Sequence, residues 1–258
     1  MWSLIVRIYA STLLTKSADK LIALSGIAKR FAALMNDTYI VGMWHKKLAS
    51  QLLWYVGDHS QSDGSPSLRP QPYRAPSFSW ASVDGMVYPA ALTDADLLID
   101  VTNIHLDYVT DDTTGLVKGG YLDLKGRMRP FEMVVKYTDT LRQLFMQVDG
   151  VIVKDSQKPY WQSGPLIMLD VNQETFDVEN KAGMLYYMPA KKGQNPADFA
   201  TYLLFSSVDD KIGTFRRIGI SSTPEAEEIE MLNGAISCMD REIPCLDYAD
   251  GLHTIRII

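Results

Sequence analysis

The apolar residues of this chain change their spacing at about residue 75, and that change limits the folds that the chain can adopt. Before this point, apolar residues such as Leu21, Leu24, Phe31 and Met35 recur every three or four positions, which is the spacing of one face of an α-helix. Beyond it, apolar and polar residues alternate over many short segments, as in half-buried β-strands. Strands without helices between them pair mostly antiparallel. We therefore predict an α+β fold, with an N-terminal helical segment followed by a mostly antiparallel β-barrel or β-sandwich and one late helix.

The two spacings predict individual elements along the chain. Helices are expected from about Trp2 to Leu14, from Leu21 to Met35 and from about Trp44 to Val56. The late helix, residues 224–236, opens with a proline and four acidic residues, which favour a helix start. The predicted strands span residues 86–88, 97–108, 116–128, 131–136, 141–148, 151–154, 166–171, 183–188, 200–206, 213–220 and 253–258.

These elements divide the chain into three regions. Residues 1–56 form the helical segment, and residues 75–258 form a β-rich C-terminal domain. Between them, residues 57–74 are rich in serine, glycine and aspartate and include Pro70 and Pro72. This composition predicts a flexible polar linker.

Charge and hydropathy narrow the classes of function. The net charge of −6 argues against nucleic-acid binding, because such domains usually carry a basic surface. The apolar runs are far shorter than the roughly 20 residues that span a bilayer. The start of the chain has neither a basic leader nor a long apolar run. We therefore expect no membrane segment and a cytoplasmic location.

Three strings of the sequence are specific enough to compare with known families. They are TKSADKLIALSGIA (15–28), with YIVGMW (39–44) and LLW (52–54) after it; YRAPSFSWASVDG (73–85); and GTFRRIG (213–219). Together they resemble the region just downstream of the HET domain in fungal heterokaryon-incompatibility proteins. The match runs along almost the whole chain in the same order. The strings that mark the HET domain itself, S-Y-x-W-G and W-I-D-x-x-C-I-N-Q, do not occur.

The resemblance implies a role and a set of structural residues. It implies a non-catalytic regulatory or interaction module of an intracellular protein involved in non-self recognition and cell death. Residues 1–56 would then be the tail of a HET domain or the linker from it, and the partner would be a HET domain in the same chain or another. The motif residues that it singles out as structural are Asp19, Lys20, Gly26, Trp44, Trp54, Ala75, Pro76, Ser77, Phe78, Ser79, Trp80, Ser82, Arg217 and Gly219.

The second string also has a physical interpretation of its own. Pro76 favours extended backbone before it, and Phe78 and Trp80 then alternate with serines, so that both rings lie on one face. The rings are expected to fill the core where the chain enters the β-rich domain, with an aromatic ligand platform as the alternative. Tyr73 and Arg74, just before them, are expected to make surface contacts.

Several polar groups are candidates for chemistry or binding. Asn103, His105 and Asp107 share one face of a predicted strand, where they would bind a metal, act as acid and base, or simply face solvent. Arg216 and Arg217 would meet an acidic partner or solvent. No complete catalytic signature occurs, so we expect no enzyme, metal or cofactor. The candidate ligand- or partner-binding residues are Tyr73, Arg74, Trp80, His105, Asp107, Arg216 and Arg217.

Two other functions stay open from the sequence. One is a carbohydrate-binding β module that uses aromatic residues, namely Trp80, Tyr108, Tyr121 or Trp161. The other is an uncharacterised enzyme, with a site assembled from distant strands around His105 and Asp107. Exposed coplanar rings would favour the first, and a second ionisable cluster beside His105 would favour the other.

Overall fold

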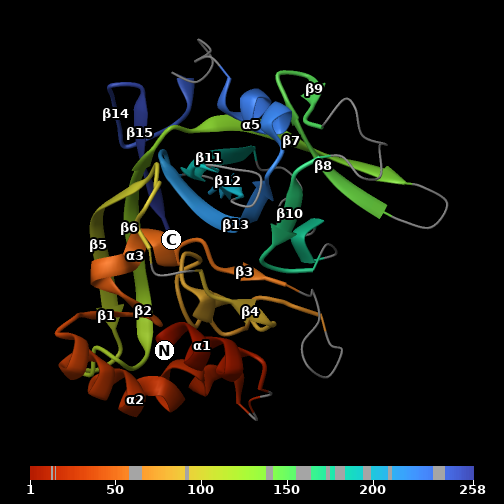
Figure 1. Cartoon of the computed structure of the whole chain (residues 1–258). Coiled ribbons are helices and arrows are strands. Elements are labelled where there is room, and N and C mark those ends of the chain that lie inside the picture. The colour runs from red at the N-terminus through yellow and green to blue at the C-terminus, as the bar shows by residue number, and fades with distance from the viewer. Residues whose placement is uncertain are drawn as a thin grey trace.

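The chain folds into one large β-sheet with α-helices mainly at two ends of the molecule (Figure 1), as the computed structural model shows. The α+β class predicted from the sequence is thus confirmed. The structure describes residues 1–12, 14, 16–57, 66–90, 93–137, 142–154, 164–172, 175–177, 184–193, 199–208, 211–234 and 242–258.

The helices lie mainly at the two ends of the chain. Helix α1 (Trp2–Ala10) and helix α2 (Lys20–Met35) contact each other through the rings of Trp2 and Phe31 and lie at one end of the molecule (Figure 1). A 3-10 turn, η1 (Ser17–Asp19), precedes α2, which ends at Asn36 in the left-handed conformation that often terminates helices. Helix α5 (Ala226–Asn233) lies at the opposite end and confirms the late helix.

The helix predicted from about Trp44 to Val56 is wrong for most of its length. Only α3 (Leu48–Gln51) is α-helical, after a 3-10 turn, η2 (His45–Lys47). Trp44 instead belongs to a small hairpin, β1 (Tyr39–Ile40) with β2 (Met43–Trp44). The Gln51 side chain accepts a hydrogen bond from the backbone N–H of Trp44 and donates one to its carbonyl, which satisfies this backbone without a helix.

Most predicted strands are present, with small shifts at their ends. The strands that pair into the main sheet are β5 (Asp100–Tyr108), β6 (Val117–Gly126), β7 (Arg129–Tyr137), β8 (Arg142–Val148), β9 (Val151–Ile152), β10 (Leu166–Leu169), β11 (Leu185–Lys191), β12 (Ala200–Ser207), β13 (Thr214–Thr223), β14 (Asp247–Ala249) and β15 (Leu252–Ile257). A separate pair joins β3 (Tyr55–Val56) to β4 (Val87–Tyr88). The sequence did not predict β1, β2, β3 or β14, which are two or three residues long.

The main sheet is antiparallel except at one pairing. Its strands run in the order β5-β6-β15-β13-β12-β11-β7-β8-β9, with β10 on β13 and β14 on β15. Among the strands that the structure describes, only β13 and β15 pair in parallel. Within the described residues this path is open from β5 to β9, so the predicted closed barrel is not what these strands form.

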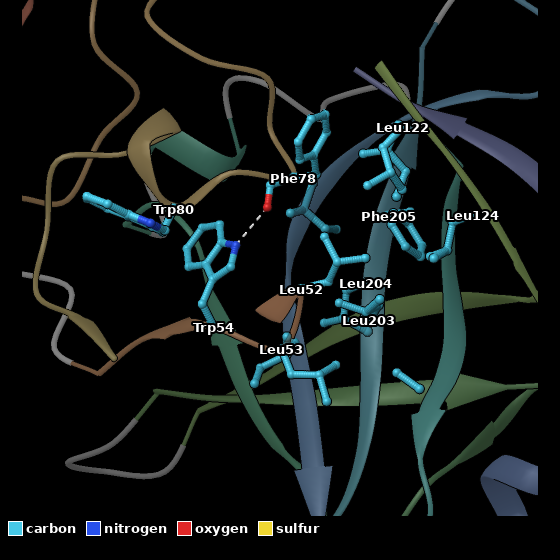
Figure 2. Packing of buried hydrophobic residues seen from close by; sticks show 14 of the residues in the cluster. Leu52, Leu53, Trp54, Phe78, Trp80, Leu122, Leu124, Leu203, Leu204 and Phe205 are labelled. Atoms are coloured by element: carbon cyan, nitrogen blue, oxygen red, sulfur yellow. Dashed lines mark hydrogen bonds between the residues drawn. The ribbon is translucent and has the colours of Figure 1, made fainter. Parts of the chain in front are cut away.

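One hydrophobic core joins the helical segment to the sheet. It includes Trp2 and Leu21 from the helices as well as Leu122, Leu204 and Ile255 from the strands. Figure 2 shows where the two parts meet, with Trp54 next to the chain at Phe78 and Trp80. No helix in the described part of the chain is both long and apolar enough to cross a membrane.

The described part of the predicted linker is anchored to its surroundings. Ser67 is fully buried, and its hydroxyl donates a hydrogen bond to the Asp170 carbonyl. Arg74 is also buried. Residues 66–74 therefore lie against the folded domain, and the rest of the predicted linker, residues 58–65, falls outside the described residues.

Candidate functional site

Arg74 is held inside the protein by four groups. Its guanidinium donates to the carbonyls of Ala81 (2.6 Å) and Val83 (2.9 Å), bonds Ser17 and forms an ion pair with Asp84 at 2.8 Å. These partners come from both sides of the junction between the helical segment and the sheet. The expectation that Arg74 makes surface contacts is therefore wrong, because its hydrogen bonds pull the side chain inward.

Lys20 reaches the same carboxylate from the first turn of α2. Its ammonium donates to the Val83 carbonyl at 2.7 Å and lies 3.6 Å from Asp84. Burial, aided by the positive charge of Arg74 and opposed by Asp84, lowers the pKa of Lys20 to about 7. Burial alone would raise the pKa of Asp84. The pKa nevertheless lies below its usual value, because the carboxylate is stabilised by Arg74, Lys20 and a hydrogen bond from Ser17.

Trp80 fixes the second string to the N-terminal segment. Its indole N–H donates to the Gly42 carbonyl at 2.9 Å, and the indole N–H of Trp2 donates to the same oxygen at the same distance. Gly42 has a φ of +93°, and a Cβ there would lie 2.5 Å from Trp80 Nε1. Trp80 is buried in this contact, so it is part of the core and does not offer a ligand platform.

Arg217 occupies a second buried position, on β13. Its guanidinium lies 3.6 Å from the ring centroid of Trp54, donates to Asp170 Oδ1 at 2.6 Å and bonds the Trp54 carbonyl. Burial raises the pKa of Asp170 and lowers that of Arg217 to about 10, which leaves the guanidinium charged at neutral pH. The prediction that Arg217 faces an acidic partner or solvent is wrong, because this carboxylate is internal.

The other motif residues mostly belong to the same junction. The Trp54 indole donates to the Phe78 carbonyl at 2.9 Å (Figure 2), and Ser77 accepts a hydrogen bond from the Arg217 amide. Gly219 lets β10 approach β13, since a Cβ there would lie 2.4 Å from the Met168 carbonyl. Asp19 and Gly26 are exposed and lie outside this junction. We call the contacts of Trp54, Arg74, Ser77, Trp80 and Arg217 the motif junction.

A basic pocket opens beside the motif junction. It has a volume of about 420 Å³, and its charged lining consists of Arg69, Arg74, Lys118, Lys211 and Arg216. The remaining lining residues are Pro70, Gln71, Tyr73, Ala75, Ser77, Ser82, Gly119, Gly120 and Ile258. Three of the predicted binding residues, Tyr73, Arg74 and Arg216, therefore come together here.

Tyr73 is the exposed aromatic residue at this pocket. Burial of its hydroxyl, together with the negative charge of Asp107, raises its pKa to about 12. The phenol therefore stays protonated near neutral pH and can donate a hydrogen bond. Asp107 lies close by on β5, with its carboxylate 3.6 Å from the position of a Cβ at Gly119.

His105 and Asp107 stand on an exposed edge strand. Their side chains contact each other at 3.0 Å, and more than half of each is open to solvent. Asn103 points to Asp123 instead, with its amide 3.0 Å from that carboxylate. Among the described residues, no group of three or more acidic, histidine or cysteine side chains is arranged to hold a metal ion. The arrangement matches the solvent face of an edge strand.

A larger, mainly apolar cavity of about 770 Å³ lies elsewhere, beside the stacked rings of Tyr55 and Tyr88. Lys191 is the one charged residue among its described lining residues, and three others, Gly57, Thr93 and Phe199, adjoin segments outside the described residues, so we assign it no site. Neither this cavity nor the cations Arg69, Lys118 and Lys211 were predicted from the sequence. These three cations lie in distant segments, and no local spacing links them.

Comparison with known proteins gives no relative. A scan against protein-family models finds no match, and neither a search of curated proteins nor one of solved structures finds any.

Proposed function

We propose that this chain is a non-catalytic interaction module of a heterokaryon-incompatibility-type protein, acting in the cytoplasm in fungal non-self recognition and cell death. Its partner is a HET domain, in the same chain or in another. The sequence resemblance motivates the family. The observation that carries the interaction role is the outer face of helix α1.

Helix α1 is apolar on opposite sides. Trp2 and Val6 are buried against the rest of the protein. Leu4 and Ile8, one helical turn apart on the other side, are each 58% exposed. A helix that is apolar all round is normally covered on all sides, and exposed apolar surface often marks a contact with another protein. We assign this surface, Leu4 with Ile8, to the HET domain and call it the outer α1 face.

The two alternative functions have weaker support. The ring of Tyr121 has the Arg256 guanidinium 3.6 Å from its centroid, so that one face is already covered and a sugar cannot stack there. Trp80 is buried, and Trp161 lies outside the described residues. An enzyme built around His105 and Asp107 has less support because both side chains are more than half exposed on an edge strand, although Tyr121 and the Asp123–Arg256 ion pair lie beside His105.

The proposal is tested by measuring binding between this chain and a purified HET domain. A double variant, Leu4→Glu with Ile8→Glu, places two charges on the outer α1 face and is expected to weaken binding at least about tenfold, since a buried unpaired charge is costly. The matched control is Val151→Glu, at a β9 residue that is 55% exposed. Equal binding by the double variant and the control, with melting temperatures unchanged, would contradict the proposal, as would no binding by the wild-type chain.

A further inference from the structure

The basic pocket has an unusual charge for this protein. The chain as a whole carries a net charge of −6, yet five of the pocket's fourteen lining residues are arginine or lysine and none is aspartate or glutamate. Like charges gathered around a concave surface repel one another and concentrate the field inside it. A pocket of this kind attracts anions.

Two of the five cations are already engaged within the protein. Arg74 pairs with Asp84, while Arg69 donates to the Arg217 carbonyl at 2.6 Å and to Ser82 at 3.1 Å. These contacts hold the floor of the pocket in place. The engaged arginines are therefore fixed in place, and the carboxylates of Asp84 and Asp170 offset their charges.

The other three cations are available. Lys118 projects from β6, Lys211 lies just before β13, and Arg216 lies on β13 beside the buried Arg217. Within the described residues, no ion pair engages any of the three side chains. Lys211 and Arg216 are five positions apart, whereas Lys118 comes from a distant strand and meets them only in the folded protein.

The pocket also has room for a ligand and neutral groups to orient it. Gly119 and Gly120 line the wall beside Lys118 with backbone alone. The Tyr73 hydroxyl supplies a donor. The main-chain oxygen of Ile258 accepts hydrogen bonds from Ser77 and so is already occupied. The volume of about 420 Å³ lies within the range of small-molecule sites.

We propose that the basic pocket binds a dianionic phosphate group, with Arg216, Lys118 and Lys211 as its ligands and Tyr73 as an additional donor. The number of free cations favours a phosphate over a carboxylate, which carries only one charge. Arginine forms paired hydrogen bonds to phosphate oxygens, and lysine acts as a point charge beside them. The phosphate is carried by a small organic molecule or is free inorganic phosphate. This site is separate from the outer α1 face, so either proposal can fail without the other.

Calorimetric titration of the full chain in low-salt buffer at pH 7.5 tests the inference. Inorganic phosphate, glucose 6-phosphate and glucose are the three probes. Saturable binding is expected for one or both phosphates and none for glucose. Tighter binding of the sugar phosphate would identify an organic carrier, and equal or weaker binding would identify free phosphate. Absence of saturable binding to both phosphates would overturn the inference.

Two variants and a control locate the site. Arg216→Gln and Lys118→Gln are each expected to weaken phosphate binding about tenfold, because each removes a charge-assisted hydrogen bond. The control, Lys136→Gln, removes the same charge from an exposed position on β7 and should leave binding unchanged. Equal losses in all three would indicate general attraction to a positive surface and overturn the assignment. Lys118 is fully at the surface, so its variant keeps the test valid if Arg216→Gln folds poorly.

Discussion

Arg217 stacks its guanidinium on the ring of Trp54, with 3.6 Å between the guanidinium carbon and the ring centroid. The two residues are 163 positions apart in the chain, and Asp170 neutralises the arginine from a third segment. This contact connects the helical segment to the central strand β13. The ring and the carboxylate together explain why the charge of Arg217 is tolerated in the interior.

Removing one partner of this buried pair should be costly. Arg217→Met leaves the Asp170 carboxylate buried beside only Arg69, at 3.5 Å. We expect the free energy of unfolding to fall by about 3–5 kcal/mol, the usual cost of an uncompensated buried charge. Urea denaturation measures this change in the free energy of unfolding. The adjacent Arg216→Met, at a half-buried pocket position, should change stability by less than about 0.5 kcal/mol, and equal losses at both positions would contradict the account.

Glycine is required at Gly42 and not at Gly26. A Cβ at Gly42 would collide with Trp80 at a φ of +93°, so Gly42→Ala should destabilise the protein by roughly 1–3 kcal/mol. Gly26 lies in α2 with nothing within 4 Å of a Cβ, so Gly26→Ala should stabilise by about 0.5–1 kcal/mol. Thermal unfolding should give a lower melting temperature for Gly42→Ala and a higher one for Gly26→Ala than for the wild type. A stabilising Gly42→Ala would show that Trp80 does not pack as described.

Lys20 should give the stability a pH dependence above neutrality. Its pKa is about 7 in the folded protein and 10.5 when exposed, so between these values the unfolded chain binds a proton that the folded chain does not. The free energy of unfolding therefore rises with pH in this window, by at most about 1.4 kcal/mol per unit. Asp84 does not interfere, because its lowered pKa places its titration in acid.

The matched variant for this effect is Lys20→Met, which keeps an unbranched side chain one atom shorter than lysine and removes the titrating amine. Urea denaturation at pH 6, 7.5 and 9 gives the free energy of unfolding of both proteins. The value for the wild type minus the value for the variant should increase by about 1–2 kcal/mol between pH 7.5 and pH 9. Below pH 7 the difference should level off. Parallel pH profiles for the two proteins would contradict the burial of Lys20 beside Arg74.

The exposed pair on β5 should matter little for stability. His105 and Asp107 contact each other in solvent on an edge strand. Exposed pairs of this kind contribute at most about 1 kcal/mol. We expect Asp107→Asn to leave the melting temperature nearly unchanged, and a large loss would indicate a structural role that the described contacts do not explain.

The sequence predicted elements well where one periodicity dominates. The stripe containing Leu21 and Leu24 predicted α2, and the alternation after residue 96 predicted β5. The sequence prediction failed near Trp44, where the Gln51 side chain, and not the next helical turn, bonds the Trp44 backbone. Spacing alone does not reveal that a side chain has replaced helical backbone bonding.

The candidate site was predicted only in part. Local pattern identified Tyr73 and Arg216, which line the basic pocket, but it also placed Arg74 and Arg217 at the surface. Each of these arginines is buried because an internal carboxylate pairs with it. Arg74 pairs with Asp84 and Arg217 pairs with Asp170, and neither pairing is visible as a local sequence pattern. Lys118 and Lys211 join the pocket only after the sheet brings β6 and β13 together.

Hydrogen–deuterium exchange tests the proposed contact between the outer α1 face and a HET domain. Amide exchange of the full chain is measured with and without a saturating HET domain. The account predicts slower exchange in α1, residues Trp2–Ala10, and in the neighbouring part of α2. Unchanged exchange in α1, or slowing confined to the β-rich domain, would contradict it.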